Sequence, residues 1–457
     1  MWWIRDFHGW AGGVVSSDAS SRNGKGLSMN PDFWMRMAVG ISHAWSYDQP
    51  ADVSKNPAPP QRPRVVVASP PDPVRSEADF EEQGEITVAA EYGAVLGFVA
   101  VGDDGLIALT GVNQRYGSRN TVNRGIQIPN RLVQLDQRGE ERWHVKLDWS
   151  PRGLTRADDG TVYVVGDTTV AWYSASGDLV GHQDAPHFSL PKESSQEFQK
   201  EVVERRDLTV NQQARSLKQR EDALQALEEK PTEKRTPADN ASMKSLAQQI
   251  TTHKQSLEHL QKKTPEQLLT EAVAQAKQLH RVAVSHDHVF LVSNETAGYG
   301  YAVWRCDRTC ENPVKIIGGL RGCCGQMDLQ LAGDKLIIAE NSRHRVLVTD
   351  FEGVTVTTFG KRDSNDKENG FGGCCNPMNT CRAPDGGLLT SESHGLIKRY
   401  ALDGSFQGVV GVANVASGCK NSTVGISADG KTVYFLDVTK GRIVRFTQRE
   451  DAVDIRG

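Results

Sequence analysis

The stretch F-G-G-C-C-N-P-M-N-T-C-R-A-P-D-G-G-L-L-T-S-E-S-H-G-L-I-K-R-Y-A-L-D-G-S-F (Phe371–Phe406) contains one unit of a repeat. It alternates β-type runs with two glycine turns, Asp385–Gly387 and Asp403–Ser405. Glycine-containing turns between short β runs are hairpin signals. The unit therefore predicts a four-stranded antiparallel sheet.

Comparable units recur along the chain, about 40 to 55 residues apart where they adjoin, which is the spacing of propeller repeats. Six units start near Val95, Gly153, Arg281, Met327, Met378 and Thr423. The last unit has only three β runs before the chain ends. We expect the run at Glu85–Gly93 to supply its fourth strand, because such a closure removes the open sheet edges.

The quoted unit resembles the repeat of NHL six-bladed β-propellers. Three runs further resemble those of a bacterial, planctomycete-type subgroup of that family: Cys-Cys-Gly-Gln-Met at Cys323–Met327, Glu-Asn-Ser-Arg-His-Arg at Glu340–Arg345, and Gly-Cys-Cys-Asn-Pro-Met at Gly373–Met378. The resemblance is clearest over Arg281–Phe446. It implies an all-β six-bladed propeller and no particular activity.

A different composition interrupts the repeats. Residues 193–280 contain almost no glycine and are rich in Gln, Glu, Lys, Ala and Leu. Val203, Val210, Leu217 and Leu224 recur every seventh position, which is typical of a coiled-coil-like seam. The segment predicts a helical hairpin inserted between the second and third units. It joins a fourth strand to a first strand, so we expect it to leave the propeller at the end where the first strands begin.

These features divide the chain into five parts. The expected domains are an irregular leader and Pro-rich linker at 1–84, a closing strand with two blades at 85–189, a helical insertion at 190–280, four blades at 281–448 and a tail at 449–457. The run Trp34–Ser46 is compatible with an export signal, and also with a leader or an upstream start codon. We favour export to the periplasm or the outside.

The overall charge argues against a nucleic-acid partner. The 457 residues carry a net charge of −4 and no nucleic-acid-binding motif. No apolar run approaches the roughly 18 residues that a membrane span needs. The sequence thus predicts neither a nucleic-acid partner nor a membrane span.

All 8 cysteines lie between Cys306 and Cys419. Five of them precede the first strands of three consecutive units: Cys323, Cys324, Cys374, Cys375 and Cys419. In propellers of the resembled type these loops lie at one mouth of the central axis, so the resemblance implies that the five cysteines converge there. Adjacent cysteines rarely bridge each other.

Three interpretations of these cysteines stay open. One is disulfides between blades, with Cys306 and Cys310 pairing nearby. The second is a thiolate site for zinc, copper or an iron–sulfur cluster, with His344 and His394 as further ligands. The third is buried free thiols. Glu340, Glu392 and Asp437 occupy equivalent loop positions and are expected to order those loops.

The predicted function depends on which of these interpretations holds. We favour a non-enzymatic scaffold that binds a protein or small ligand at its top face, with the helical arm binding a partner or self-associating. One alternative is a metal- or redox-active propeller, and another is a metal-dependent lyase or hydrolase. NHL-like propellers include peptidyl-amidoglycolate lyases, but the His-rich metal set of that family has no clear equivalent here.

Overall fold

The computed structural model describes residues 78–101, 105–112, 128–189, 195–296, 300–323, 327–373, 375–416 and 421–449. Cys324, Cys374 and Cys419, most of the predicted leader and nearly all of the predicted tail lie outside these ranges. Within them, no helix is long and apolar enough to cross a membrane.

The described strands form six antiparallel sheets of four strands each. The first two sheets contain β2 (Ala94–Ala100), β3 (Leu106–Gly111), β4 (Asn130–Leu135) and β5 (Glu141–Leu147), then β6 (Gly153–Arg156), β7 (Val162–Gly166), β8 (Thr169–Tyr173) and β9 (Leu179–Asp184). The third and fourth contain β10 (Leu279–Val284), β11 (His288–Asn294), β12 (Tyr301–Asp307) and β13 (Val314–Leu320), then β14 (Asp328–Ala332), β15 (Lys335–Glu340), β16 (Arg345–Thr349) and β17 (Thr355–Phe359). The last two contain β18 (Asn379–Arg382), β19 (Leu388–Ser391), β20 (Leu396–Tyr400) and β21 (Phe406–Val412), then β22 (Val424–Ile426), β23 (Thr432–Asp437), β24 (Arg442–Gln448) and β1 (Phe80–Ile86).

The six sheets close into a ring. The first strands contact one another in the order β2, β6, β10, β14, β18, β22 and back to β2. An apolar core fills each junction between neighbouring sheets, including the one between the sixth sheet and the first. This arrangement is that of a β-propeller, so the predicted fold class is confirmed at that level.

The ring closes through β1, which pairs antiparallel with β24. The strand spans Phe80–Ile86, whereas the sequence placed it at 85–93. The predicted bounds are wrong because Ala90–Tyr92, at the end of the predicted strand, forms a 3-10 turn instead. Gly93 follows with φ of 78°, and a Cβ there would lie 2.5 Å from the carbonyl oxygen of Gly111. The chain therefore turns at Gly93 into β2.

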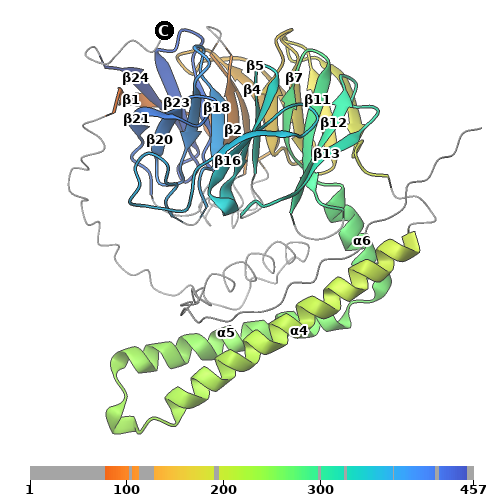
Figure 1. Cartoon of the computed structure of the whole chain (residues 1–457), viewed down its shortest axis with the longest axis vertical. Coiled ribbons are helices and arrows are strands. Elements are labelled where there is room, and N and C mark those ends of the chain that lie inside the picture. The colour runs from red at the N-terminus through yellow and green to blue at the C-terminus, as the bar shows by residue number, and fades with distance from the viewer. Residues whose placement is uncertain are drawn as a thin grey trace, which may run out of the picture. The chain divides into compact units, whose positions relative to one another are not determined.

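Three described helices lie between β9 and β10: α4 (Ser195–Glu228), α5 (Pro237–Lys262) and α6 (Pro265–Ala276). Both α5 and α6 begin with a threonine capping box and a proline in the first turn, a pattern that satisfies the first free N–H groups. Figure 1 shows α4 alongside α5, and the two helices contact each other. Leu217, Ile250 and Leu257 are buried in their seam.

Candidate functional site

Polar side chains gather where the first strands of the sheets begin. We call this end of the ring the mouth, and its central residues the mouth cluster: Arg152, His280, Arg281, Asp328 and Asn421. They lie at or just before β6, β10, β14 and β22. Side chains from separate sheets therefore meet near the axis of the ring.

Arg281 on β10 is the centre of the cluster. Its Nη1 donates to the carbonyl oxygens of His280, at 2.8 Å, and of Arg152. Its Nη2 donates to Oδ1 of Asn421 at 3.1 Å. Its Nε lies 3.5 Å from Oδ1 of Asp328. The side chain is 12% exposed, and it connects the third sheet to the second, fourth and sixth.

Asp328, the first residue of β14, is fully buried. Its Oδ2 accepts from the backbone N–H and the hydroxyl of Thr380 on β18, at 2.9 and 3.2 Å. Burial raises the pKa of the Asp328 carboxyl, while the charge of Arg281 opposes that rise. The carboxylate thus links the fourth and fifth sheets and balances one guanidinium charge.

His280 is buried beside the two arginines. Its Nε2 lies 3.0 Å from Oδ1 of Asn294, and its Nδ1 lies 3.4 Å from Nη1 of Arg152. Burial lowers the pKa of His280 well below its usual range, and the charges of Arg152 and Arg281 lower it further. The imidazole is therefore neutral, with Nε2–H donating to Asn294 and Nδ1 accepting from Arg152.

The base of α6 reaches this cluster through hydrogen bonds. Nδ2 of Asn294 donates to the carbonyl oxygen of Gln275 at 2.8 Å. Nη1 of Arg152 lies 3.3 Å from Oε1 of Gln278. The end of the helical segment is thus bonded to the residues that surround His280.

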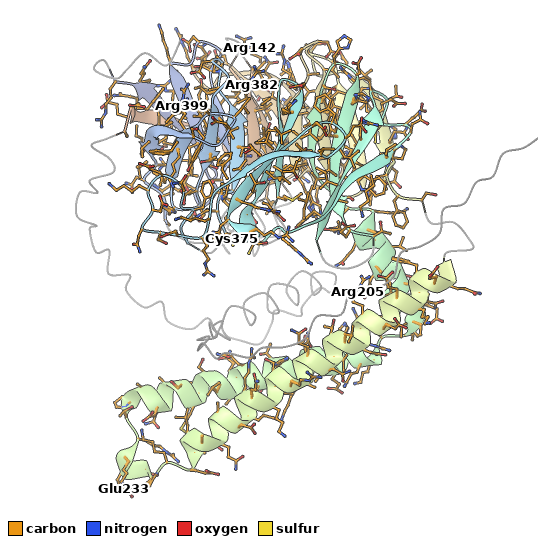
Figure 2. The ribbon with its side chains drawn as sticks, in the orientation of Figure 1. Arg142, Arg205, Glu233, Cys375, Arg382 and Arg399 are labelled. Carbon is orange, nitrogen blue, oxygen red and sulfur yellow. The ribbon has the colours of Figure 1, made fainter. Side chains whose placement is uncertain are left out.

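Two predicted cysteines fall within the described part of this end. Cys323 is half-buried, and its N–H donates to Oδ1 of Asn341 at 2.7 Å. Nδ2 of Asn341 in turn lies 3.7 Å from the sulfur of Met378. Cys375 is fully buried, and Figure 2 shows it at the opposite end of the propeller from Arg142. The loops before β14 and β18 are therefore joined through Asn341.

The described residues offer no ready-made metal centre. Among them, no group of three or more His, Cys, Asp and Glu side chains is placed to hold a metal ion. Cys324, Cys374 and Cys419 lie outside the described ranges, so the predicted thiolate site stays a prediction.

The pairing of Cys306 with Cys310, which belonged to the disulfide interpretation, is not present. Both are buried free thiols in the core between the second and third sheets. Burial raises the pKa of Cys306 to about 12 and also raises the pKa of Cys310. These two cysteines act as apolar core residues.

The three predicted loop carboxylates are buried and bonded within their own sheets. Glu340 accepts from Arg343 Nη1 at 2.7 Å and Arg345 Nε at 2.6 Å. Glu392 lies 3.0 Å from Nζ of Lys398, and Asp437 accepts from the N–H groups of Thr439 and Lys440 at 3.2 and 3.3 Å. These contacts order the loops between second and third strands.

The two predicted histidines differ in their surroundings. His344 is buried, and its Nδ1 lies 3.0 Å from the carbonyl oxygen of Phe371, in the loop before β18. The His394 side chain is 43% exposed, and its Nδ1 is 3.9 Å from Oε2 of Glu392. His344 thus joins neighbouring loops, whereas His394 faces solvent.

The mouth cluster was not predicted from the sequence. Its members lie at the starts of the second, third, fourth and sixth repeat units, so aligning the starts of the units would have shown a polar residue recurring where an apolar first strand is expected. The cysteine pairs drew attention to the same loops but not to the strand residues that follow them.

Comparisons with known proteins add little to this picture. The sequence matches no protein-family model and no curated protein sequence. Regucalcin, a calcium-binding protein from Agrobacterium tumefaciens, is 10% identical, with a TM-score of 0.41 over 82% of this chain and 97% of that chain. Virginiamycin B lyase from Staphylococcus aureus is 11% identical, with a TM-score of 0.38 over 81% of this chain and 100% of that chain.

The Pan2 WD40 domain from Neurospora crassa is 9% identical, with a TM-score of 0.37 over 79% of this chain and 77% of that chain. At these identities and TM-scores, the propeller assignment rests on the closed ring of sheets in this chain.

Proposed function

We propose that this chain is a non-enzymatic, NHL-type six-bladed β-propeller that binds a partner at the mouth. The observation that carries the proposal is the convergence of polar side chains from separate sheets on one end of the axis. A few convergent polar groups on a rigid scaffold are typical of ligand sites. In this proposal the domain order is that expected from the sequence, with the closing strand at Phe80–Ile86 and the helical segment before β10 forming an arm.

The state of the mouth cluster supports binding over acid–base catalysis. A general acid or base must reach the proton that it moves. Both ring nitrogens of His280 already face protein groups, and the carboxylate of Asp328 is fully buried. Neither group is free to exchange a proton with a substrate, so the cluster is better suited to hold a ligand.

The helical arm has a role in the same proposal. Its base bonds to Asn294, which in turn bonds to His280. Leu208 on α4 is 70% exposed, and an exposed leucine on a long helix suits contact with a protein partner or a second arm. The arm would thus add a protein-binding surface to a propeller that is exported.

Affinity purification from the source organism tests this function. The wild-type chain is compared with Arg152→Glu at the mouth and with Arg142→Glu on β5, and bound proteins and metabolites are identified by mass spectrometry. We expect a partner that binds the purified wild type with a measurable Kd. The Arg152→Glu variant should lose this binding, and the Arg142→Glu variant should retain it. The proposal would be overturned if Arg152→Glu bound the partner as tightly as the wild type, or if the bound compound were turned over.

The metal- or redox-active alternative is separated by a different measurement. Metal content and the thiol count after denaturation are measured on protein purified without chelators. Near-stoichiometric metal, with thiols that become reactive on chelation, would favour a thiolate site and the lyase or hydrolase class. Metal-free protein would favour the scaffold.

A further inference from the structure

The mouth cluster has an excess of positive charge. Arg152 and Arg281 are neighbours, since Nη1 of Arg281 donates to the backbone carbonyl oxygen of Arg152 and the Nη1 atoms of both arginines contact His280. Only Asp328 forms an ion pair with either guanidinium among the described residues. His280 between them is neutral. Two positive charges therefore share one buried carboxylate.

Neighbouring acids do not cancel this excess. Glu340, Glu392 and Asp437 each have a basic partner in their own sheet. Asp167, in the loop between β7 and β8 of the second sheet, accepts from the backbone N–H of Ser150 at 2.8 Å. It makes no ion pair with Arg152 within the described part of the chain. Like charges held together at a partly desolvated site attract an anion.

The side chain of Arg152 has the geometry to bind an anion. It is exposed, and only its Nη1 has side-chain partners among the described residues, namely the neutral acceptors of Gln278 and His280. Its Nε and Nη2, which form one edge of the guanidinium plane, have no partner there. That edge is the fork that binds the two oxygens of a carboxylate or a phosphate.

Arg281 can add to the same contact. A guanidinium has five N–H groups, and among the described residues the second N–H of Nη2 has no partner besides the bond that the first makes to Asn421. We propose that the mouth binds an oxyanion group, a carboxylate or a phosphate, through the free edge of Arg152 and the guanidinium of Arg281. This inference rests on the proposed function and names the chemistry of the ligand.

Titration calorimetry with inorganic phosphate and with succinate tests whether the mouth binds an oxyanion. Ionic strength is held constant with sodium chloride, so that general screening does not change. We expect saturable binding of at least one of the two anions to the wild type, and the two titrations show which oxyanion is preferred. Arg152→Gln should weaken that binding about tenfold or more, because a charge-assisted pair is lost.

Arg142→Gln is the matched control, since it removes the same charge from β5, at the end of the propeller opposite Cys375 (Figure 2). It should leave binding unchanged. Arg152 is exposed, so its variant should fold, which circular dichroism checks. Absence of saturable binding of both anions, or equal binding by Arg152→Gln, would overturn the oxyanion assignment. Either result would leave the affinity purification free to support or reject a partner at the mouth.

Discussion

Arg281 of the third sheet donates a hydrogen bond to Asn421, which lies just before the first strand of the sixth sheet, at 3.1 Å. In the ring of six sheets the third and sixth are opposite each other. This bond therefore crosses the axis of the propeller. One side chain ties together strands that lie 140 residues apart in sequence.

Loss of Arg281 should destabilise the fold. Arg281→Met leaves Asp328 buried without its ion-pair partner, and breaking one side of a buried pair costs about 3–5 kcal/mol. Urea unfolding measures the free energy. Adding Asp328→Asn should recover part of the loss, and Arg142→Met should change stability by less than about 0.5 kcal/mol. Equal effects of Arg281→Met and Arg142→Met would show that the crossing pair contributes little.

Acid should destabilise the protein through His280. Burial, with the nearby arginine charges, lowers its pKa in the folded state, while the unfolded value is about 6.5. Below about pH 6.5 the unfolded chain binds more protons than the folded one, so stability falls as the pH falls. Asp328 has the opposite sign, because its folded pKa is raised and the folded state gains stability as the pH falls toward the unfolded value of about 3.9.

The two contributions can be separated with variants. Unfolding free energies at about pH 7.5 and about pH 5.5 should differ less in His280→Gln than in the wild type, by up to about 1.4 kcal/mol per pH unit. His286→Gln, at a side chain that is 94% exposed, should behave like the wild type. An unchanged pH dependence in His280→Gln would mean that folding does not lower the pKa of His280.

The closing strand should contribute strongly to stability. Phe80 on β1 is 2% exposed and packs in the core between the fifth and sixth sheets. Phe80→Ala should cost about 3–5 kcal/mol, because it removes a large buried ring and leaves a cavity. Denaturant melts provide the measurement, with the exposed neighbour Glu81→Ala as control. A loss no larger than that of Glu81→Ala would indicate that the ring holds without β1.

The core cysteines should be inert in the native protein. Cys306 and Cys310 are 1% and 0% exposed, and a thiol reacts as its thiolate. Burial raises the pKa of Cys306 to about 12. Cys306→Ala/Cys310→Ala should therefore leave the number of thiols that react with a disulfide reagent under native conditions unchanged, and lower it after denaturation. If a disulfide joined them, the double substitution would leave the number of thiols that react after denaturation unchanged.

How far the sequence predicts the structure differs from element to element. The turn at Asp385–Gly387 lies between β18 and β19, as expected from its residues alone, because a hairpin depends on a few neighbouring positions. The closing strand was expected, but its position was wrong. The conformation of Gly93 depends on its contact with Gly111 in the next strand, which no local pattern shows.

By itself, the sequence determined the repeat of four-stranded units, since glycine turns and β runs are local signals that recur along the chain. It also located the loops that carry the cysteines. Only the tertiary structure decided that Arg152, Arg281, Asp328 and Asn421 form one cluster. Their contacts join strands from different sheets, and closure of the ring brings those strands to a common axis. Ordinary polar residues thereby become a positively charged mouth.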